Sequence, residues 1–121
     1  MAPSDAAASL QLPGYLRLRN LPEFNQWSLH FDVGGPRTAE RVAELGHEPN
    51  GYFWAGVVQR LVELGELPEV ETDPEGDTFS AYGTRTLMER LSQALVPYLT
   101  DPGALTALVT AADADGFDFD D

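Results

Sequence analysis

The stretch QWSLHFDV, residues 26–33, decides the fold class of this chain. Apolar side chains occupy every second position, at Trp27, Leu29, Phe31 and Val33, and polar side chains fill the positions between them. A period of two residues is that of a β-strand with one buried and one solvated face. This alternation is typical of antiparallel sheets, because strands of parallel sheets are apolar on both faces. We therefore predict an antiparallel sheet with the core on one side.

Three further strands are predicted around this stretch. Before it, residues 10–19 show a less regular alternation of apolar and polar side chains, which Pro13 and Gly14 interrupt. After it, residues 69–73 and 78–82 are predicted as two strands. The sequence PEGD between them suits a hairpin loop, because proline and glycine favour turn conformations. The sheet is therefore expected to hold about four strands.

Four segments repeat apolar residues at the three- and four-residue spacing of an amphipathic helix. We predict helices over residues 36–45, 51–64, 84–99 and 103–112. Gly46 and Gly65 are expected to end the first two helices, and Asn50 to cap the start of the second. Pro97 is expected to end or kink the third, because proline lacks the backbone N–H of a helix interior.

The predicted element order is therefore ββααββαα. Two strand pairs, each followed by a helix pair, indicate an α+β fold in which helices pack on one face of an antiparallel sheet. The length of 121 residues fits one domain. We assign it to residues 1–112, with 1–9 expected to be flexible, and interpret 113–121 as an acidic C-terminal tail.

Composition excludes several classes of protein. Cysteine is absent, which excludes disulfides, thiolate catalysis and cysteine-based metal sites. No apolar run approaches the roughly 18 residues of a membrane span. The first 14 residues contain no basic residue and no long apolar core, which argues against a secretory signal. We therefore expect a cytoplasmic location.

Negative charge is concentrated in the second half of the chain. The sequence holds 20 acids against 7 bases, all arginine, for a net charge of −13. Residues 1–60 hold 6 acids and 5 arginines, and residues 61–121 hold 14 acids and 2 arginines. This asymmetry disfavours binding to nucleic acid or an anionic membrane and favours a basic partner. The alternative interpretation is that the acids serve solubility alone.

The densest acidic segment lies between residues 63 and 77, where seven acids occur without a base. Such density suggests either an interaction surface or a solvated face. The C-terminal acids could extend the surface, while Phe117 and Phe119 could either anchor a partner or fold back on the domain. The candidate partner-binding residues from these two segments are Glu66, Glu69, Glu71, Asp73, Glu75, Asp77, Asp118, Asp120 and Asp121.

Catalytic and metal sites find little support. Ser28, His30 and Asp32 include the residue types of a hydrolytic triad, but they share one face of one strand. Alternate residues there lie about 6.6–7 Å apart with parallel side chains, so a polar sheet face is the better interpretation. Two histidines lack the spacing of a zinc site, and the acidic C-terminus lacks the final glutamate of a calcium loop. We assign no catalytic residue, no cofactor and no metal.

One run of sequence resembles a known family. The residues LGHEPNGYFW, 45–54, follow a strand that ends in FDVG, 31–34. Together they are similar to the immunity protein 51 family of bacterial polymorphic-toxin systems. The resemblance is sharpest over residues 27–64, and it implies a small α+β domain that inhibits a toxin. The run also supplies a second, weaker candidate patch at His47, Glu48, Asn50 and Tyr52.

The favoured hypothesis is therefore a non-enzymatic immunity protein. It would bind a cognate toxin domain and protect the producing cell, filling a basic active-site cleft, such as that of a nuclease, with its acidic surface. The alternative is an acidic adaptor or nucleic-acid mimic that binds a cellular nucleic-acid-binding protein. A third hypothesis, a small hydrolase, rests on Ser28, His30 and Asp32 alone.

Overall fold

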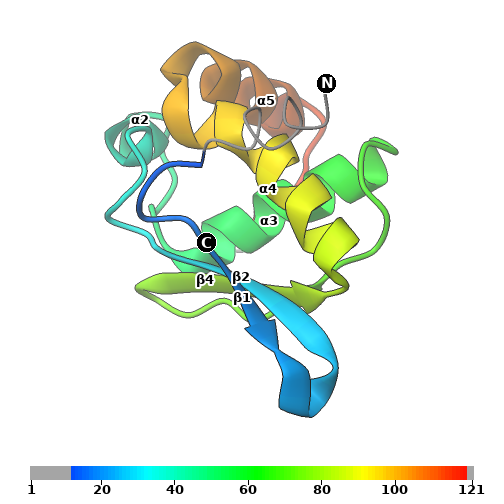
Figure 1. Ribbon diagram of the computed structural model, residues 1–121. Helices are drawn as coiled ribbons and strands as arrows, with labels where there is room; N and C mark the ends of the chain where they lie inside the picture. Colours follow the sequence, from blue (N-terminus) through cyan, green and yellow to red (C-terminus); the bar gives the residue numbers. More distant parts are fainter. Residues whose placement is uncertain (1–11, 120–121) are drawn as a thin grey trace, which may run out of the picture.

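The computed structural model describes residues 12–119 and shows an antiparallel sheet of four strands (Figure 1). Its strands follow the order β1-β2-β4-β3. They are β1 (Arg17–Leu21), β2 (Gln26–Asp32), β3 (Glu71–Thr72) and β4 (Thr78–Gly83). The helices are α2 (Ala39–Glu44), α3 (Gly51–Glu63), α4 (Arg85–Thr100) and α5 (Pro102–Ala114), and a 3₁₀ turn, η1 (Pro22–Phe24), joins β1 to β2. The α+β prediction is confirmed.

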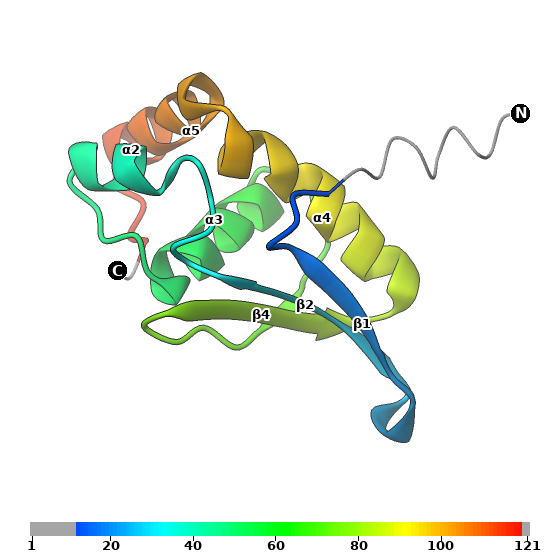
Figure 2. The ribbon, with the colours of Figure 1, turned by 60° about the vertical axis from the view of Figure 1, so that its left-hand side comes forward.

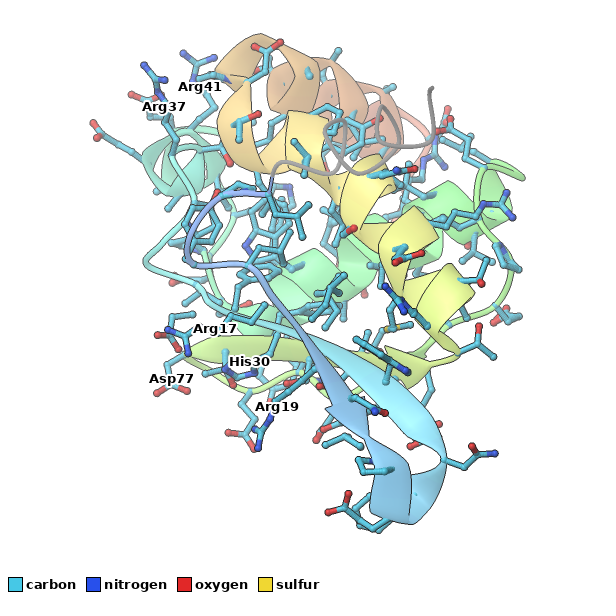
Figure 3. The ribbon with its side chains drawn as sticks, in the orientation of Figure 1. Arg17, Arg19, His30, Arg37, Arg41 and Asp77 are labelled. Atoms are coloured by element: carbon cyan, nitrogen blue, oxygen red, sulfur yellow. The ribbon has the colours of Figure 1, made fainter. Side chains whose placement is uncertain are left out.

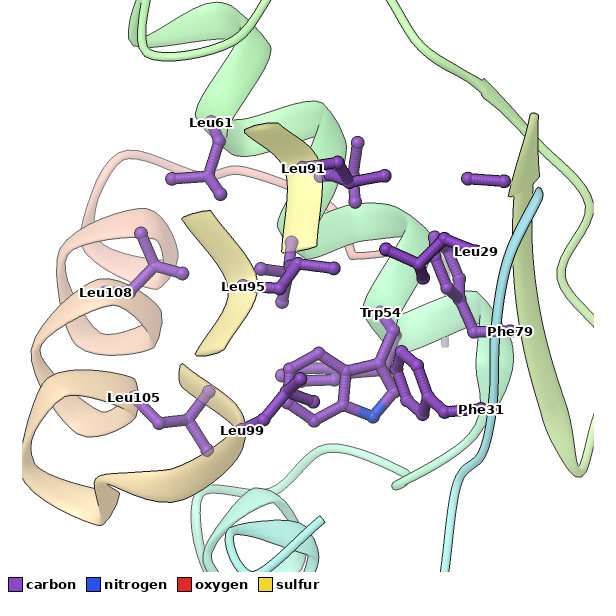
Figure 4. Packing of buried hydrophobic residues seen from close by; sticks show 14 of the residues in the cluster. Leu29, Phe31, Trp54, Leu61, Phe79, Leu91, Leu95, Leu99, Leu105 and Leu108 are labelled. Carbon is purple, nitrogen blue, oxygen red and sulfur yellow. The ribbon is translucent and has the colours of Figure 1, made fainter. Parts of the chain in front are cut away.

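All four helices lie on one face of the sheet and leave the other face open (Figure 2). The alternation in β2 explains this arrangement, because Leu29 and Phe31 are fully buried beneath the helices while Asp32 is exposed. Phe31 packs edge-on against Trp54 of α3, with ring centroids 5.8 Å apart. Figure 4 shows the side chains between sheet and helices: Leu29, Phe31, Phe79, Trp54, Leu91, Leu95 and Leu99.

Side-chain caps fix the helix boundaries. The side chain of Asn50 accepts a hydrogen bond from the backbone N–H of Phe53 at 2.8 Å, as predicted. Thr84 and Asp101 cap α4 and α5 in the same way. Gly46 follows the end of α2 and adopts a φ of +87°, a conformation that strains any residue with a side chain.

Several predicted boundaries differ from the structure. β1 begins at Arg17 rather than at residue 10, because the chain turns at Pro13, whose carbonyl accepts a hydrogen bond from the N–H of Leu16. β3 holds two residues instead of five, and α2 starts three residues later than expected. Pro97 does not end α4, because the buried Leu95 and Leu99 on either side hold the last turn in the core.

The C-terminal segment packs on the domain. α5 continues to Ala114, and Gly116 reverses the chain with a φ of +76°. Phe119 is 1% exposed and stacks on Phe53 with centroids 5.1 Å apart. The segment from 113 to 119 is thus part of the domain, and Phe119 folds back instead of anchoring a partner. Asp120 and Asp121 lie outside the described residues, as does the flexible segment expected at 1–9.

Candidate partner interface

Five exposed carboxylates line one border of the sheet. They occupy β3, the outermost strand, and the loops on either side of it. None of them forms an ion pair with a base among residues 12–119. We call this set the acidic edge: Glu69, Glu71, Asp73, Glu75 and Asp77.

The strand register sets the direction of two of these side chains. Glu71 lies opposite Tyr82, and the N–H of Asp73 donates to the carbonyl of Ser80 at 2.8 Å. Directly opposed residues of antiparallel strands share a face, so both carboxylates leave the sheet on the helix-free side. The half-buried Val70 and Thr72 alternate with them, as the sequence predicts.

Glu66 lies apart from the acidic edge. It follows α3, and its carbonyl accepts a hydrogen bond from Arg90 of α4 at 3.2 Å. Burial raises the pKa of Tyr98, also on α4, above its usual value, and the negative charge of Glu66 raises that pKa further. The structure therefore places Glu66 beside the helices rather than with the other five acids.

The start of α3 holds the hairpin that carries the acidic edge. The backbone N–H of Gly51 donates to the carbonyl of Glu75 at 2.9 Å. A Cβ atom at Gly51 would lie 2.0 Å from the carbonyl oxygen of Thr78 and 2.3 Å from that of Glu75. Only glycine allows this approach, so the run at 45–54 positions the hairpin.

A hollow of about 790 Å³ adjoins the acidic edge. Its walls come from α3, from β3 and its hairpin, and from the C-terminal segment. Tyr52 of α3 and Asp118 line it together with Thr72 and Pro74 of the hairpin. The structure thus brings Tyr52 and Asp118 beside Thr72 and Pro74 of the hairpin that carries the acidic edge, although they are far apart in sequence. We call this feature the edge hollow.

The edge hollow has a neutralised arginine in its wall. Arg60 is 9% exposed and forms an ion pair with Asp115, and its Nη1 lies 3.8 Å from Glu63. Its guanidinium lies over the ring of Phe117, 5.6 Å from the centroid. Asp118 adds a third carboxylate, so the lining residues carry three acids against one base. The net negative charge of the lining residues therefore favours a bound cation.

The second predicted patch divides between structural and exposed residues. Nε2 of His47 lies 3.1 Å from both carboxylate oxygens of Asp113, and its ring contacts that of Phe119 at 4.9 Å. His47 therefore fastens the C-terminal segment, and Asn50 caps α3. Glu48 is exposed, and the side chain of Tyr52 is 42% exposed at the edge hollow.

The three residues considered for a triad do not assemble into one. Nδ1 of His30 lies 2.8 Å from the hydroxyl of Ser80 on the neighbouring strand. Ser28 is 7% exposed, while Asp32 is exposed, and no carboxylate of residues 12–119 bonds to His30. The sequence did not reveal the contact with Ser80, because it depends on the pairing of β2 with β4.

Comparison with known proteins adds no identification: the chain matches no family model, no curated protein and no solved structure. Within residues 12–119, no group of three or more histidines and acids is arranged to hold a metal ion. None of the helices in that part of the chain is long and apolar enough to cross a membrane.

Proposed function

We propose that this chain is a non-enzymatic immunity protein that binds a cognate bacterial toxin domain in the cytoplasm of the producing cell. The acidic edge carries the proposal: its five exposed carboxylates are unpaired within residues 12–119, and Thr72 and Pro74 of the same hairpin line a hollow that favours a cation. The resemblance of residues 45–54 to the immunity protein 51 family supports the same function. The proposed mode of inhibition is occlusion of a basic active-site cleft by this surface.

Charge density of this kind favours a basic partner for two reasons. Unpaired carboxylates repel one another in the free protein, and a basic partner relieves that repulsion on binding. The same field attracts the partner during diffusion, and such steering raises association rates to about 10⁸–10⁹ M⁻¹s⁻¹ at low salt. A toxin domain that acts on nucleic acid presents a basic cleft and fits this description.

The edge hollow is suited to an arginine or lysine of the partner. The apolar stem of either side chain can lie against the rings of Tyr52 and Phe117. Its charge then faces Asp118 and Glu63, both exposed at this hollow. Aromatic rings attract cations within about 6 Å of the centroid, which adds to the ion pairs.

The test is the association rate of the chain with the toxin domain encoded by the neighbouring gene, measured across a salt series. We expect the double variant Glu71→Lys/Asp73→Lys to associate at least about tenfold more slowly at low salt, with a flatter salt dependence. The matched control is Glu23→Lys/Glu40→Lys, which changes the net charge equally at two exposed acids away from the acidic edge.

The control distinguishes an effect of the acidic edge itself from an effect of the net charge of the protein. If the control slows association as much as Glu71→Lys/Asp73→Lys, the acidic edge is not the binding surface. A set of several nucleic-acid-binding partners, all lost at modest salt, would replace the immunity function with that of a nucleic-acid mimic.

A further inference from the structure

Six polar side chains form a grid on the open face of the sheet. The register places Arg17 opposite His30 and Arg19 opposite Ser28, across β1 and β2. It continues to β4, where Ser80 lies opposite His30 and Tyr82 opposite Ser28. Directly opposed side chains start about 4.5–5.5 Å apart, and neighbours along a strand about 6.6–7 Å apart. With Leu21, these six residues line a hollow of about 520 Å³, which we call the face hollow.

The two arginines of the face hollow are unpaired within the described chain. Four of the other arginines bond to an acid or a backbone carbonyl, namely Arg41, Arg60, Arg85 and Arg90. Arg17 and Arg19 are exposed and form no ion pair with an acid among residues 12–119, in a sequence with 20 acids. Figure 3 shows both on the side of the sheet away from the helices, with His30 beside them.

No carboxylate of residues 12–119 lines the face hollow, although Glu71 lies opposite its lining residue Tyr82 and Asp32 follows His30 on the same face of β2. Glu71 and Asp73 belong to β3, three strands from β1, and strands are spaced about 4.8 Å apart. The three strand spacings between β1 and β3 add up to about 14 Å, which exceeds the Debye length of about 8 Å at physiological ionic strength. The charge of Glu71 and Asp73 is therefore largely screened at the two arginines. Asp32 lies one row beyond His30 on β2, and its exposed side chain is outside the lining of the face hollow.

We propose that the face hollow binds the phosphate group of a small molecule. Two guanidinium groups provide the bidentate hydrogen bonds and the positive charge that phosphate requires. The hydroxyls of Ser28 and Tyr82 offer further hydrogen bonds, and the hydrogen-bonded pair of His30 and Ser80 keeps one more donor for the ligand.

The number of donors favours phosphate over carboxylate. A carboxylate has two oxygens, and one arginine is enough to bind both of them. A second arginine at the next outward-facing position of the same strand, with imidazole and hydroxyls around it, matches the three or more oxygens of a phosphate. The volume of the face hollow falls within the range of about 300–1,000 Å³ that is usual for sites of small ligands.

This site is independent of the proposed function. The acidic edge offers negative charge at β3, whereas the face hollow offers positive charge at β1. A protein with a net charge of −13 repels anions at long range, so a phosphate is held here only by its direct contacts. Phosphate binding should therefore depend on the side chains of Arg17 and Arg19 themselves and not on the net charge of the protein.

The test is a calorimetric titration of the full chain at low salt with inorganic phosphate, adenosine 5′-monophosphate and adenosine. We expect saturable binding of the two phosphate compounds and none of adenosine. The variant Arg17→Gln/Arg19→Gln should weaken phosphate binding at least tenfold. Arg37→Gln is the control, because Arg37 is exposed beside α2, away from this face (Figure 3), and should change binding less than twofold.

The pattern of affinities identifies the source of the phosphate. Equal affinity for inorganic phosphate and the nucleotide supports a site for the phosphate group alone, and tighter nucleotide binding supports an esterified ligand. The proposal is overturned if neither phosphate compound saturates, if adenosine binds as tightly as its monophosphate, or if the double arginine variant binds like the unchanged protein.

Discussion

At the scale of single residues, the run at 45–54 acts mainly as a connector. Gly46 ends one helix and Asn50 caps the next. At Gly51 the hairpin backbone packs so closely on α3 that no side chain would fit between them. His47 holds the C-terminal segment through Asp113 and Phe119. The sequence predicts the capping roles, because they depend on neighbouring residues. The contacts of Gly51 and His47 involve partners more than 20 residues away and are absent from any local pattern.

Gly51→Ala should destabilise the protein strongly. Its Cβ would press against two backbone carbonyls, and overpacking costs about 1–3 kcal/mol, with the upper end expected here because the rigid backbone must shift. Urea unfolding measures the change in the free energy of unfolding. The control is Gly34→Ala, where nothing lies within 4 Å of the added atom, and we expect a change below about 0.5 kcal/mol. Equal effects of the two substitutions would contradict the close packing of the hairpin on α3.

Tyr15→Phe should stabilise the protein by up to about 1 kcal/mol, because the buried hydroxyl of Tyr15 has no hydrogen-bond partner among the described residues. Burial also raises the pKa of Tyr15 above its usual value of 10.0. As the pH rises, Tyr15 therefore ionises first in the unfolded chain. Its ionisation leaves the free energy of unfolding unchanged below about pH 10 and lowers it as the pH rises further.

The variant should show a weaker fall in stability between pH 9 and pH 11 than the unchanged protein. Thermal unfolding at a series of pH values measures both effects. Tyr52→Phe, which removes the hydroxyl of an exposed ring, serves as the control at pH 8 and should change stability by less than about 0.5 kcal/mol. A loss of stability at pH 8 in Tyr15→Phe would show that its hydroxyl has a bonded partner.

At the scale of elements, the strongest periodic segments were predicted best. β2, α3, α4 and α5 carry repeated apolar positions over several turns or alternations, and they lie close to the predicted bounds. β3 and α2 are short, so their few residues give little periodic signal, and packing against neighbours determines where they begin and end. The position of β4 between β2 and β3 depends on tertiary contacts alone.

Docking of the C-terminal segment is an element-scale feature that composition obscures. Its acids suggested a solvated tail, yet Phe119 packs against Phe53 and lies over Gly56, where a Cβ would be 2.7 Å from its carbonyl oxygen. The docked segment also builds one wall of the edge hollow. That wall could not be predicted from sequence, because either conformation of the two phenylalanines was compatible with the pattern.

Phe119→Ala should cost about 3 kcal/mol of unfolding free energy, since it removes a fully buried ring. It should also expose the C-terminal segment to limited proteolysis, because His47 and Phe53 lose the ring against which they pack. Phe24→Ala is the control, since Phe24 is 68% exposed. Unchanged stability and protease resistance in Phe119→Ala would contradict the docked arrangement.

At the scale of the whole molecule, the helices cover one face of the sheet and leave the other face open (Figure 2). Five acids of the second half of the sequence form the acidic edge and three more, Glu63, Asp115 and Asp118, line the edge hollow, while two unpaired arginines lie at β1. Charge counting predicted the exposure of the acidic edge, because unpaired carboxylates are costly to bury. It could not predict that Tyr52 and Asp118 line one hollow beside that edge, since this requires the complete fold.

The central claim is that one basic toxin domain binds the acidic edge. Isothermal titration of the purified chain with the toxin domain of the neighbouring gene, at physiological salt, tests it most directly. We predict one saturable event with a 1:1 stoichiometry and a nanomolar dissociation constant, weakened at least about tenfold by Glu71→Lys/Asp73→Lys. The absence of binding, or tight binding that this variant leaves unchanged, would contradict the account.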